Sequence, residues 1–138
     1  MKRSTTVYAV ESDKSVLGFV KDFQEVVTAN DFVIHNSASM DMKKTFTHHG
    51  VPVADDFDLH MIQICKPAKS SASLGVNIER AIFMPKFVHV FSKGGATQIR
   101  FLLFDSESIA DIVPADSSFP ESLQQTFSKI CSMIDQSR

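Results

Sequence analysis

The sequence contains no tryptophan, one tyrosine and only two cysteines among its 138 residues. The two cysteines, Cys65 and Cys131, lie far apart and form no CxxC pair, which excludes a disulfide framework and a paired-cysteine redox motif. Scarce, unpaired cysteines are typical of proteins from a reducing compartment. We therefore expect free thiols and a cytoplasmic location.

An excess of basic residues and a long apolar run are also missing. Fourteen Lys and Arg residues stand against sixteen Asp and Glu residues, so the formal net charge is -2. Nucleic-acid-binding domains usually carry a basic patch or stripe, and membrane helices need about 20 consecutive apolar residues. We therefore expect no nucleic-acid partner and no membrane partner.

The residues that are present are those of an ordinary globular domain. Hydrophobic residues make up 43% of the chain and charged residues 22%, and twelve phenylalanines supply most of the aromatic side chains. These values are typical of a chain that buries a single core. We therefore treat residues 1–138 as one domain.

Hydrophobic periodicity and turn residues predict a mixed arrangement of strands and helices. We expect strands at 5–12, 31–39 and 57–66, a hairpin at 87–104 with its turn at Ser92–Gly95, and helices at 15–31, 40–50, 68–79, 106–113 and 117–136. This order predicts an α+β fold, a two-layer sandwich. Its sheet would be mixed or mostly antiparallel, with about five strands and helices mainly on one face.

Three local details of these elements are specific enough to be tested. The strand at 57–66 is rich in Ile, Leu and Met, which predicts a central strand covered on both faces. Ser118 and Glu121 have the spacing of a capping box at the start of the last helix. The apolar stripe of that helix is interpreted as a core face, with packing across a dimer as the alternative.

The stretch "ICKPA" at 64–68, followed by the segment 79–101, resembles the domain of unknown function 302 family. Members of that family typically have a strand that ends in a Cys-Asn-Pro-like turn before a short helix. Cys65, Lys66 and Pro67 match this turn, with lysine at the position where asparagine is common.

The family's second motif, which ends in Pro-Cys, is matched by Met84, Pro85 and Lys86, with lysine in place of the cysteine. The resemblance covers residues 7–104 and leaves 105–138 as a C-terminal helical extension. It implies a small α+β fold, often a homodimer, with no settled biochemical activity. Lys86 argues against a cysteine-pair redox or metal site.

Cys65 is the candidate for chemistry. At the end of a strand and before a helix N-terminus, a thiolate would be stabilised by backbone N–H groups and by the nearby Lys66 and Lys86. A buried, unreactive cysteine that packs as a small hydrophobe is the favoured interpretation. No histidine stands at a recognisable catalytic spacing from Cys65.

Three histidines, His35, His60 and His89, lie on three different predicted strands. Three imidazoles on one face would suit zinc, but no compact motif such as HExxH occurs. We therefore expect neither a metal nor a cofactor.

The leading hypothesis is a non-catalytic module of a bacterial or archaeal cytoplasm that binds a small ligand or a protein partner as a homodimer. Its site would consist of Cys65, Lys66, Pro67, Pro85 and Lys86, and the lysines favour a small anionic ligand. The alternative is a thiol-dependent enzyme or a sulfur or redox carrier that uses Cys65. A third interpretation is that the turn only connects the strand to the helix and binds no ligand.

Overall fold

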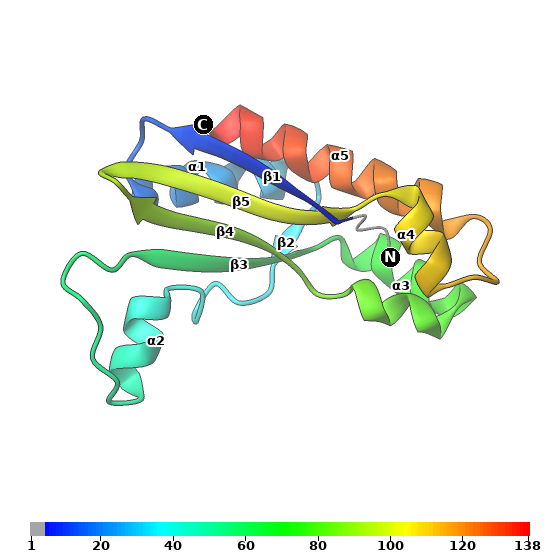
Figure 1. Cartoon of the computed structure of the whole chain (residues 1–138), viewed down its shortest axis with the longest axis horizontal. Helices are drawn as coiled ribbons and strands as arrows, with labels where there is room; N and C mark the ends of the chain where they lie inside the picture. Colours follow the sequence, from blue (N-terminus) through cyan, green and yellow to red (C-terminus); the bar gives the residue numbers. More distant parts are fainter. Residues whose placement is uncertain (1–4) are drawn as a thin grey trace.

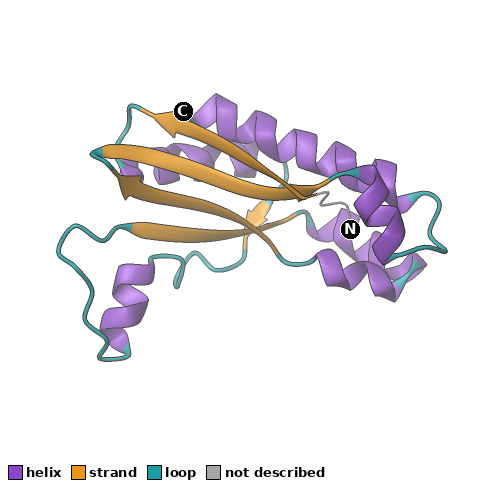
Figure 2. Ribbon diagram, viewed as in Figure 1, coloured by secondary structure: helices purple, strands orange, loops and turns teal. Residues whose placement is uncertain are grey.

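The structure of the protein is a computed structural model in which residues 5–138 are described. Figures 1 and 2 show a sheet with two long helices running behind it and a group of shorter helices at one end. The strands are β1 (Thr5–Ser12), β2 (Val33–Ile34), β3 (Leu59–Cys65), β4 (Lys86–Lys93) and β5 (Ala96–Phe104). The helices are α1 (Val16–Ala29), α2 (Met42–His48), α3 (Pro67–Val76), α4 (Ser106–Ile112) and α5 (Phe119–Ser137), and a 3-10 helix, η1 (Ile78–Phe83), follows α3.

The sheet has the strand order β1-β5-β4-β3-β2, and all its pairings are antiparallel. The α+β prediction is therefore confirmed, with the sheet antiparallel throughout. The predicted hairpin is also confirmed, because Lys93 pairs with Ala96 across Gly94 and Gly95. Both glycines have positive φ, 62° and 77°, as a tight two-residue hairpin turn requires.

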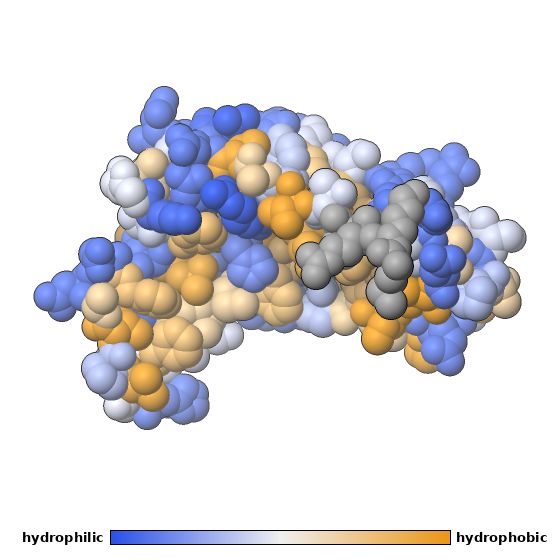
Figure 3. All heavy atoms as spheres, viewed as in Figure 1, coloured by the Kyte–Doolittle hydropathy of each residue, from blue (hydrophilic) through white to orange (hydrophobic). Residues whose placement is uncertain are grey.

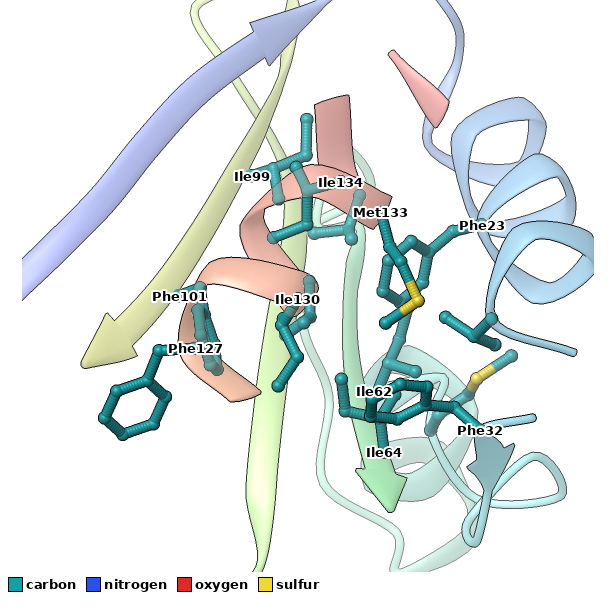
Figure 4. Close-up of a cluster of buried hydrophobic side chains, with 14 of the residues drawn as sticks. Phe23, Phe32, Ile62, Ile64, Ile99, Phe101, Phe127, Ile130, Met133 and Ile134 are labelled. Atoms are coloured by element: carbon teal, nitrogen blue, oxygen red, sulfur yellow. The ribbon is translucent and has the colours of Figure 1, made fainter. Parts of the chain in front are cut away.

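The core lies between one face of the sheet and the helices α1 and α5. Phe19, Phe23 and Val27 on α1 are fully buried, as the helical spacing predicts. Ile130 and Ile134 enter the same core from α5, so the apolar stripe of α5 is a core face within the chain (Figure 4). None of the helices within 5–138 is long and apolar enough to cross a membrane.

The predicted strand at 31–39 is much shorter in the structure, where β2 contains only Val33 and Ile34. One further backbone bond, from the His35 N–H to the Gln63 carbonyl at 2.9 Å, follows β2, and the Asn36 side chain then takes the place of the backbone ladder. Its amide nitrogen donates to the Met61 carbonyl at 2.7 Å, and its oxygen accepts from the Gln63 N–H at 2.8 Å. The edge of β3 is thus hydrogen-bonded by a side chain, which hydrophobic periodicity does not detect.

The prediction that β3 is covered on both faces is wrong. Its residues alternate, with His60, Ile62 and Ile64 buried and the intervening side chains partly exposed. The reason is that α1 and α5 cover only one face of the sheet. The opposite face, turned toward the viewer in Figure 3, mixes hydrophobic and hydrophilic residues, and the paired Val7 and Leu102 are about half exposed there.

The predicted capping box of α5 is also wrong. Ser118 makes no side-chain cap hydrogen bond. Instead, the Asp116 carboxylate accepts from the Phe119 N–H at 3.2 Å, and the Ser118 hydroxyl accepts from Arg80. An aspartate can satisfy a first-turn N–H as well as a serine can, and here it also pairs with a buried arginine.

Candidate functional site

A cavity of about 150 Å³ lies where β3 ends, α3 begins and β4 starts, and α5 forms its opposite wall. Four of the five predicted site residues line it, namely Cys65, Lys66, Pro85 and Lys86. Pro67 does not line the cavity. It opens the first turn of α3, where its fixed φ suits a helix and its missing N–H costs nothing.

Three lysines contribute to the lining of this cavity. The ammonium of Lys66 lies 5.5 Å from the centre of the Phe32 ring, and the Lys69 ammonium donates to the Thr126 hydroxyl at 2.7 Å. Lys86 is partly buried and enters at the first residue of β4. Within residues 5–138, no carboxylate pairs with any of the three, and the lining contains no Asp or Glu.

The surroundings of Lys86 and Lys69 disfavour the charged forms of these two lysines. Burial lowers the pKa of Lys86, and the neighbouring charge of Lys69 lowers it further, while Cys65 acts in the opposite direction. Burial is also the main cause that lowers the pKa of Lys69, with a smaller contribution from Lys66. The three ammonium groups therefore share one region of positive potential that no acidic side chain of the lining offsets.

Cys65 is partly buried, and its sulfur lies 3.3 Å from the Ser70 hydroxyl one turn into α3. The Ser70 N–H donates to the Lys66 carbonyl at 2.9 Å, which closes the first turn of the helix. The strand-to-helix joint thus positions a thiol, a hydroxyl and the Lys66 side chain around one cavity.

The inner part of the cavity is apolar. Its lining there consists of Phe32, Ile64, Phe119, Leu123 and Ile130, which are at most 5% exposed. Figure 4 shows Phe32 and Ile64 beside each other, with Ile130 entering the same cluster from α5. The cavity therefore reaches the core of the molecule, and its lysines lie nearer to solvent.

A buried ion pair connects two walls of the cavity. Arg80 of η1 contacts both oxygens of Asp116, at 2.5 Å and 2.8 Å, and also donates to the Ser73 hydroxyl at 3.0 Å. The Arg80 guanidinium lies 4.8 Å from the centre of the Phe119 ring. Because Ser73 and Phe119 both line the cavity, this pair holds two of its walls together.

The charge state of this ion pair is strongly favoured. The Arg80 hydrogen bond holds the pKa of the Asp116 carboxyl well below its usual range, and the Asn77 amide and the Phe119 N–H act in the same direction. Asn77 donates to Asp116 at 2.9 Å. The carboxylate thus stays ionised although it is buried.

The three histidines do not converge on one site. His60 pairs with Val90 on the helix-covered face, whereas the next residue of β3, Met61, pairs with His89 on the other face. His35 is exposed beyond the end of β2 and lines the lysine cavity, whereas His60 and His89 do not line it. Across residues 5–138, no cluster of three or more His, Cys, Asp or Glu side chains could hold a metal ion.

Sequence reasoning missed the wall that α5 contributes. Phe119, Ser122, Leu123, Thr126 and Ile130 line the cavity, and they recur at helical spacing on one face of α5. The signal that could have found them is the pair of small hydroxyl residues, Ser122 and Thr126, that interrupts an otherwise apolar stripe. Nothing in the sequence places that interruption opposite residues 65–86.

These features define a small α+β domain with one sheet face covered by helices and a lysine-lined cavity at one end. Residues 8–137 match the family described as "Domain of unknown function DUF302", and the chain belongs to this family. The match continues through α4 and α5, beyond the residues 7–104 on which the sequence resemblance rests.

A solved structure has the same fold. The crystal structure of an uncharacterized conserved DUF302 protein from Bacillus stearothermophilus superposes with a TM-score of 0.78 at 14% sequence identity. The superposition covers 96% of this chain and 98% of that one. No curated protein matches the sequence.

Proposed function

We propose that this protein binds a small anionic ligand in the lysine-lined cavity and does not transform it. The observation that supports this most directly is the composition of the lining, to which residues 5–138 contribute three lysines and no Asp or Glu. A positive region without a counter-charge attracts anions, and the partial burial of Lys66 and Lys86 strengthens their interaction with an anion. The ligand would supply the negative charge that the protein does not.

The electrostatics of Lys86 support this proposal. Its pKa is lowered mainly by burial, so its charged form is disfavoured in the free protein. An anion beside its ammonium would offset that cost and raise the pKa of Lys86 on binding. Structural lysines, in contrast, usually extend to water or pair with a carboxylate.

The test is the double variant Lys66→Ala, Lys86→Ala, examined in a thermal-shift screen with phosphate, sulfate, acetate, butanoate and benzoate. We expect at least one anion to raise the melting temperature of the wild type and not that of the variant. The double variant Lys93→Ala, Lys129→Ala is the matched control, because both lysines are exposed, lie outside the cavity and remove the same charge.

The proposal fails if no anion stabilises the wild type more than it stabilises the cavity variant. It fails equally if the control variant loses the response, since the effect would then come from net charge alone. Both variants should fold like the wild type, because lysines without ion pairs contribute little to stability. Circular dichroism establishes this before the screen.

A second candidate function rests on Cys65, whose sulfur lines the same cavity as Lys86. The thiolate is the nucleophilic form of cysteine, and the ammonium groups of the same lining are suitable counter-charges for a thiolate nucleophile or a sulfur carrier. The test uses Cys131→Ser, which leaves Cys65 as the only thiol, and measures its rate of reaction with a disulfide reagent below pH 7. Fast reaction relative to a free thiol supports this function, and a rate no greater than that of a free thiol assigns Cys65 to the cavity wall.

A further inference from the structure

We propose that the ligand of the cavity is a monocarboxylate with an apolar body of about six carbon atoms, as the cavity volume suggests. This inference rests on the proposed function, because it assumes that the lysine-lined cavity binds an anion. It further specifies the class of anion that the cavity binds.

The arrangement of the lining separates a polar rim from an apolar floor. Lys66 and Lys86 are partly exposed and Lys69 is exposed, so the cationic groups lie nearest to solvent. The floor consists of core residues that are at most 5% exposed. The charged group of a ligand would therefore stay at the rim, and its other end would point into the core.

The side chains of the floor restrict what that other end can be. Phe32, Ile64, Phe119, Leu123 and Ile130 carry no polar side-chain atom, so the floor offers no side-chain hydrogen bond. Burying a hydroxyl or a second charged group there without a hydrogen-bond partner is strongly unfavourable. A sugar phosphate, a citrate or a bare phosphate would either bear this cost or leave the floor empty.

The size of the cavity limits the apolar body. Its volume is about 150 Å³. An apolar cavity of about 150 Å³ accommodates a benzene molecule. Hexanoate and benzoate each place a carboxylate on an apolar group of about that size, whereas long-chain fatty acids exceed it.

The rim contains two kinds of hydrogen-bond donor for the negatively charged group of a ligand. Three ammonium groups and the hydroxyl of Ser70 lie around the cavity. Each carboxylate oxygen accepts hydrogen bonds, and such charge-assisted bonds are among the strongest in proteins. One carboxylate therefore occupies the rim, and the apolar floor leaves no place for a second.

The experiment is isothermal titration calorimetry of the wild-type protein with acetate, butanoate and hexanoate, at constant pH and ionic strength. We expect the affinity to rise about fourfold for each added methylene, as burial of that group predicts. Hexylamine and hexanol, which share the apolar body but lack the negative charge, serve as controls. Inorganic phosphate tests an anion without an apolar body.

The outcomes separate this inference from the proposed function. If acetate, hexanoate and phosphate bind with equal affinity, the cavity binds anions but the inference is wrong. If none of them binds, the proposed function itself fails. If hexanol or hexylamine binds as tightly as hexanoate, recognition of the charge fails, and the cavity selects only an apolar group.

A variant locates the apolar body within the cavity. Leu123→Phe narrows the floor, and we expect the affinity for hexanoate to fall at least tenfold while that for acetate is unchanged. Leu103→Phe makes the same change outside the cavity and should leave both affinities unchanged. Equal affinity of Leu123→Phe and wild type for hexanoate would overturn the inference. If that variant does not fold, the chain-length series on the wild type still decides.

Discussion

Two cations close together in the sequence, Arg80 and Lys86, show opposite ways of holding a charge inside this protein. Arg80 is 5% exposed and contacts both oxygens of Asp116. Lys86 is partly buried six residues later, and within the described chain it has no ion pair. The charge of Arg80 is thus neutralised within the fold, whereas that of Lys86 has no counter-charge in the described chain, as the proposed anion site requires.

The difference teaches how a structural charge can be told from a binding charge. A structural charge is surrounded by partners on the same chain, and the Arg80–Asp116 pair also takes Asn77 and Ser73 into its network. Lys86, at the proposed anion site, lines a cavity and has no ion-pair partner within residues 5–138. Removing the ion pair of Arg80 and removing the charge of Lys86 should therefore change the free energy of unfolding by different amounts and with opposite sign.

The largest effect is expected from Asp116→Ala. Removing one partner of a buried ion pair leaves Arg80 uncompensated, and we expect the free energy of unfolding to fall by about 3–5 kcal/mol. Urea unfolding measures this loss, with the exposed Asp111→Ala as control. The double variant Arg80→Met, Asp116→Leu should recover much of the stability. A loss below about 1 kcal/mol for Asp116→Ala would mean that the pair is not structural.

The contribution of the same ion pair to stability should be lost at acid pH. The pKa of Asp116 is lowered in the folded protein, so its contribution to stability is present above the unfolded value of about 3.9 and is lost as the pH falls below it. We expect the wild type to lose on the order of 2 kcal/mol more than Asp116→Asn between pH 5 and pH 2. Chemical denaturation at each pH gives both curves. Parallel curves would contradict the assignment.

Replacing Lys86 should have an effect of the opposite sign. Lys86→Met removes a partly buried charge without a partner, and we expect stability to stay unchanged or to rise by up to about 1 kcal/mol. Anion binding should be lost in the same variant. The exposed Lys129→Met is the control, and thermal unfolding measures both. If Lys86→Met lost as much stability as Asp116→Ala, the charge of Lys86 would stabilise the fold as that of Arg80 does, and the comparison would be wrong.

The smallest effect concerns alkaline pH. Because the folded pKa of Lys86 is lowered, the unfolded chain binds the extra proton, so this group makes stability rise with pH up to its unfolded value of about 10.4. The difference between wild type and Lys86→Met should therefore shrink as the pH rises from 8 to 10. Tyr8, whose pKa is raised to about 12 by Asp135, acts in the opposite direction but is present in both proteins. If the difference in stability between the two proteins were the same at pH 8 and pH 10, the pKa of Lys86 would not be lowered.

Most of the fold could be predicted from the sequence because its signals are local. The helical spacing of Phe19, Phe23 and Val27 specified the buried face of α1, and the glycine pair at 94–95 specified the hairpin turn. The prediction that β3 is covered on both faces failed because the helices pack on only one face of the sheet. Two other predictions failed at side-chain hydrogen bonds that the hydrophobic pattern does not encode. Asn36 hydrogen-bonds the edge of β3, and Asp116 caps α5 from outside the expected capping motif.

One wall of the candidate cavity could be predicted, and for the same reason. Cys65, Lys66, Pro85 and Lys86 lie at the ends of consecutive elements, where a turn and a strand start can be read directly. The wall formed by α5 could not, because Leu123 and Thr126 reach the cavity only through the packing of distant segments. Lys69 illustrates this, since its partner, Thr126, is 57 residues away in the sequence.

The pairing of β1 with β5 has a consequence for synthesis of the chain. Thr5 pairs with Phe104, so β1, which leaves the ribosome before β2, β3, β4 and β5, finds its partner only after about a hundred further residues have been made. Until then β1 is an unpaired edge, which is a template for association with other chains. The nascent chain is therefore most in need of chaperone protection before β5 emerges, and such pairing between distant segments also slows folding.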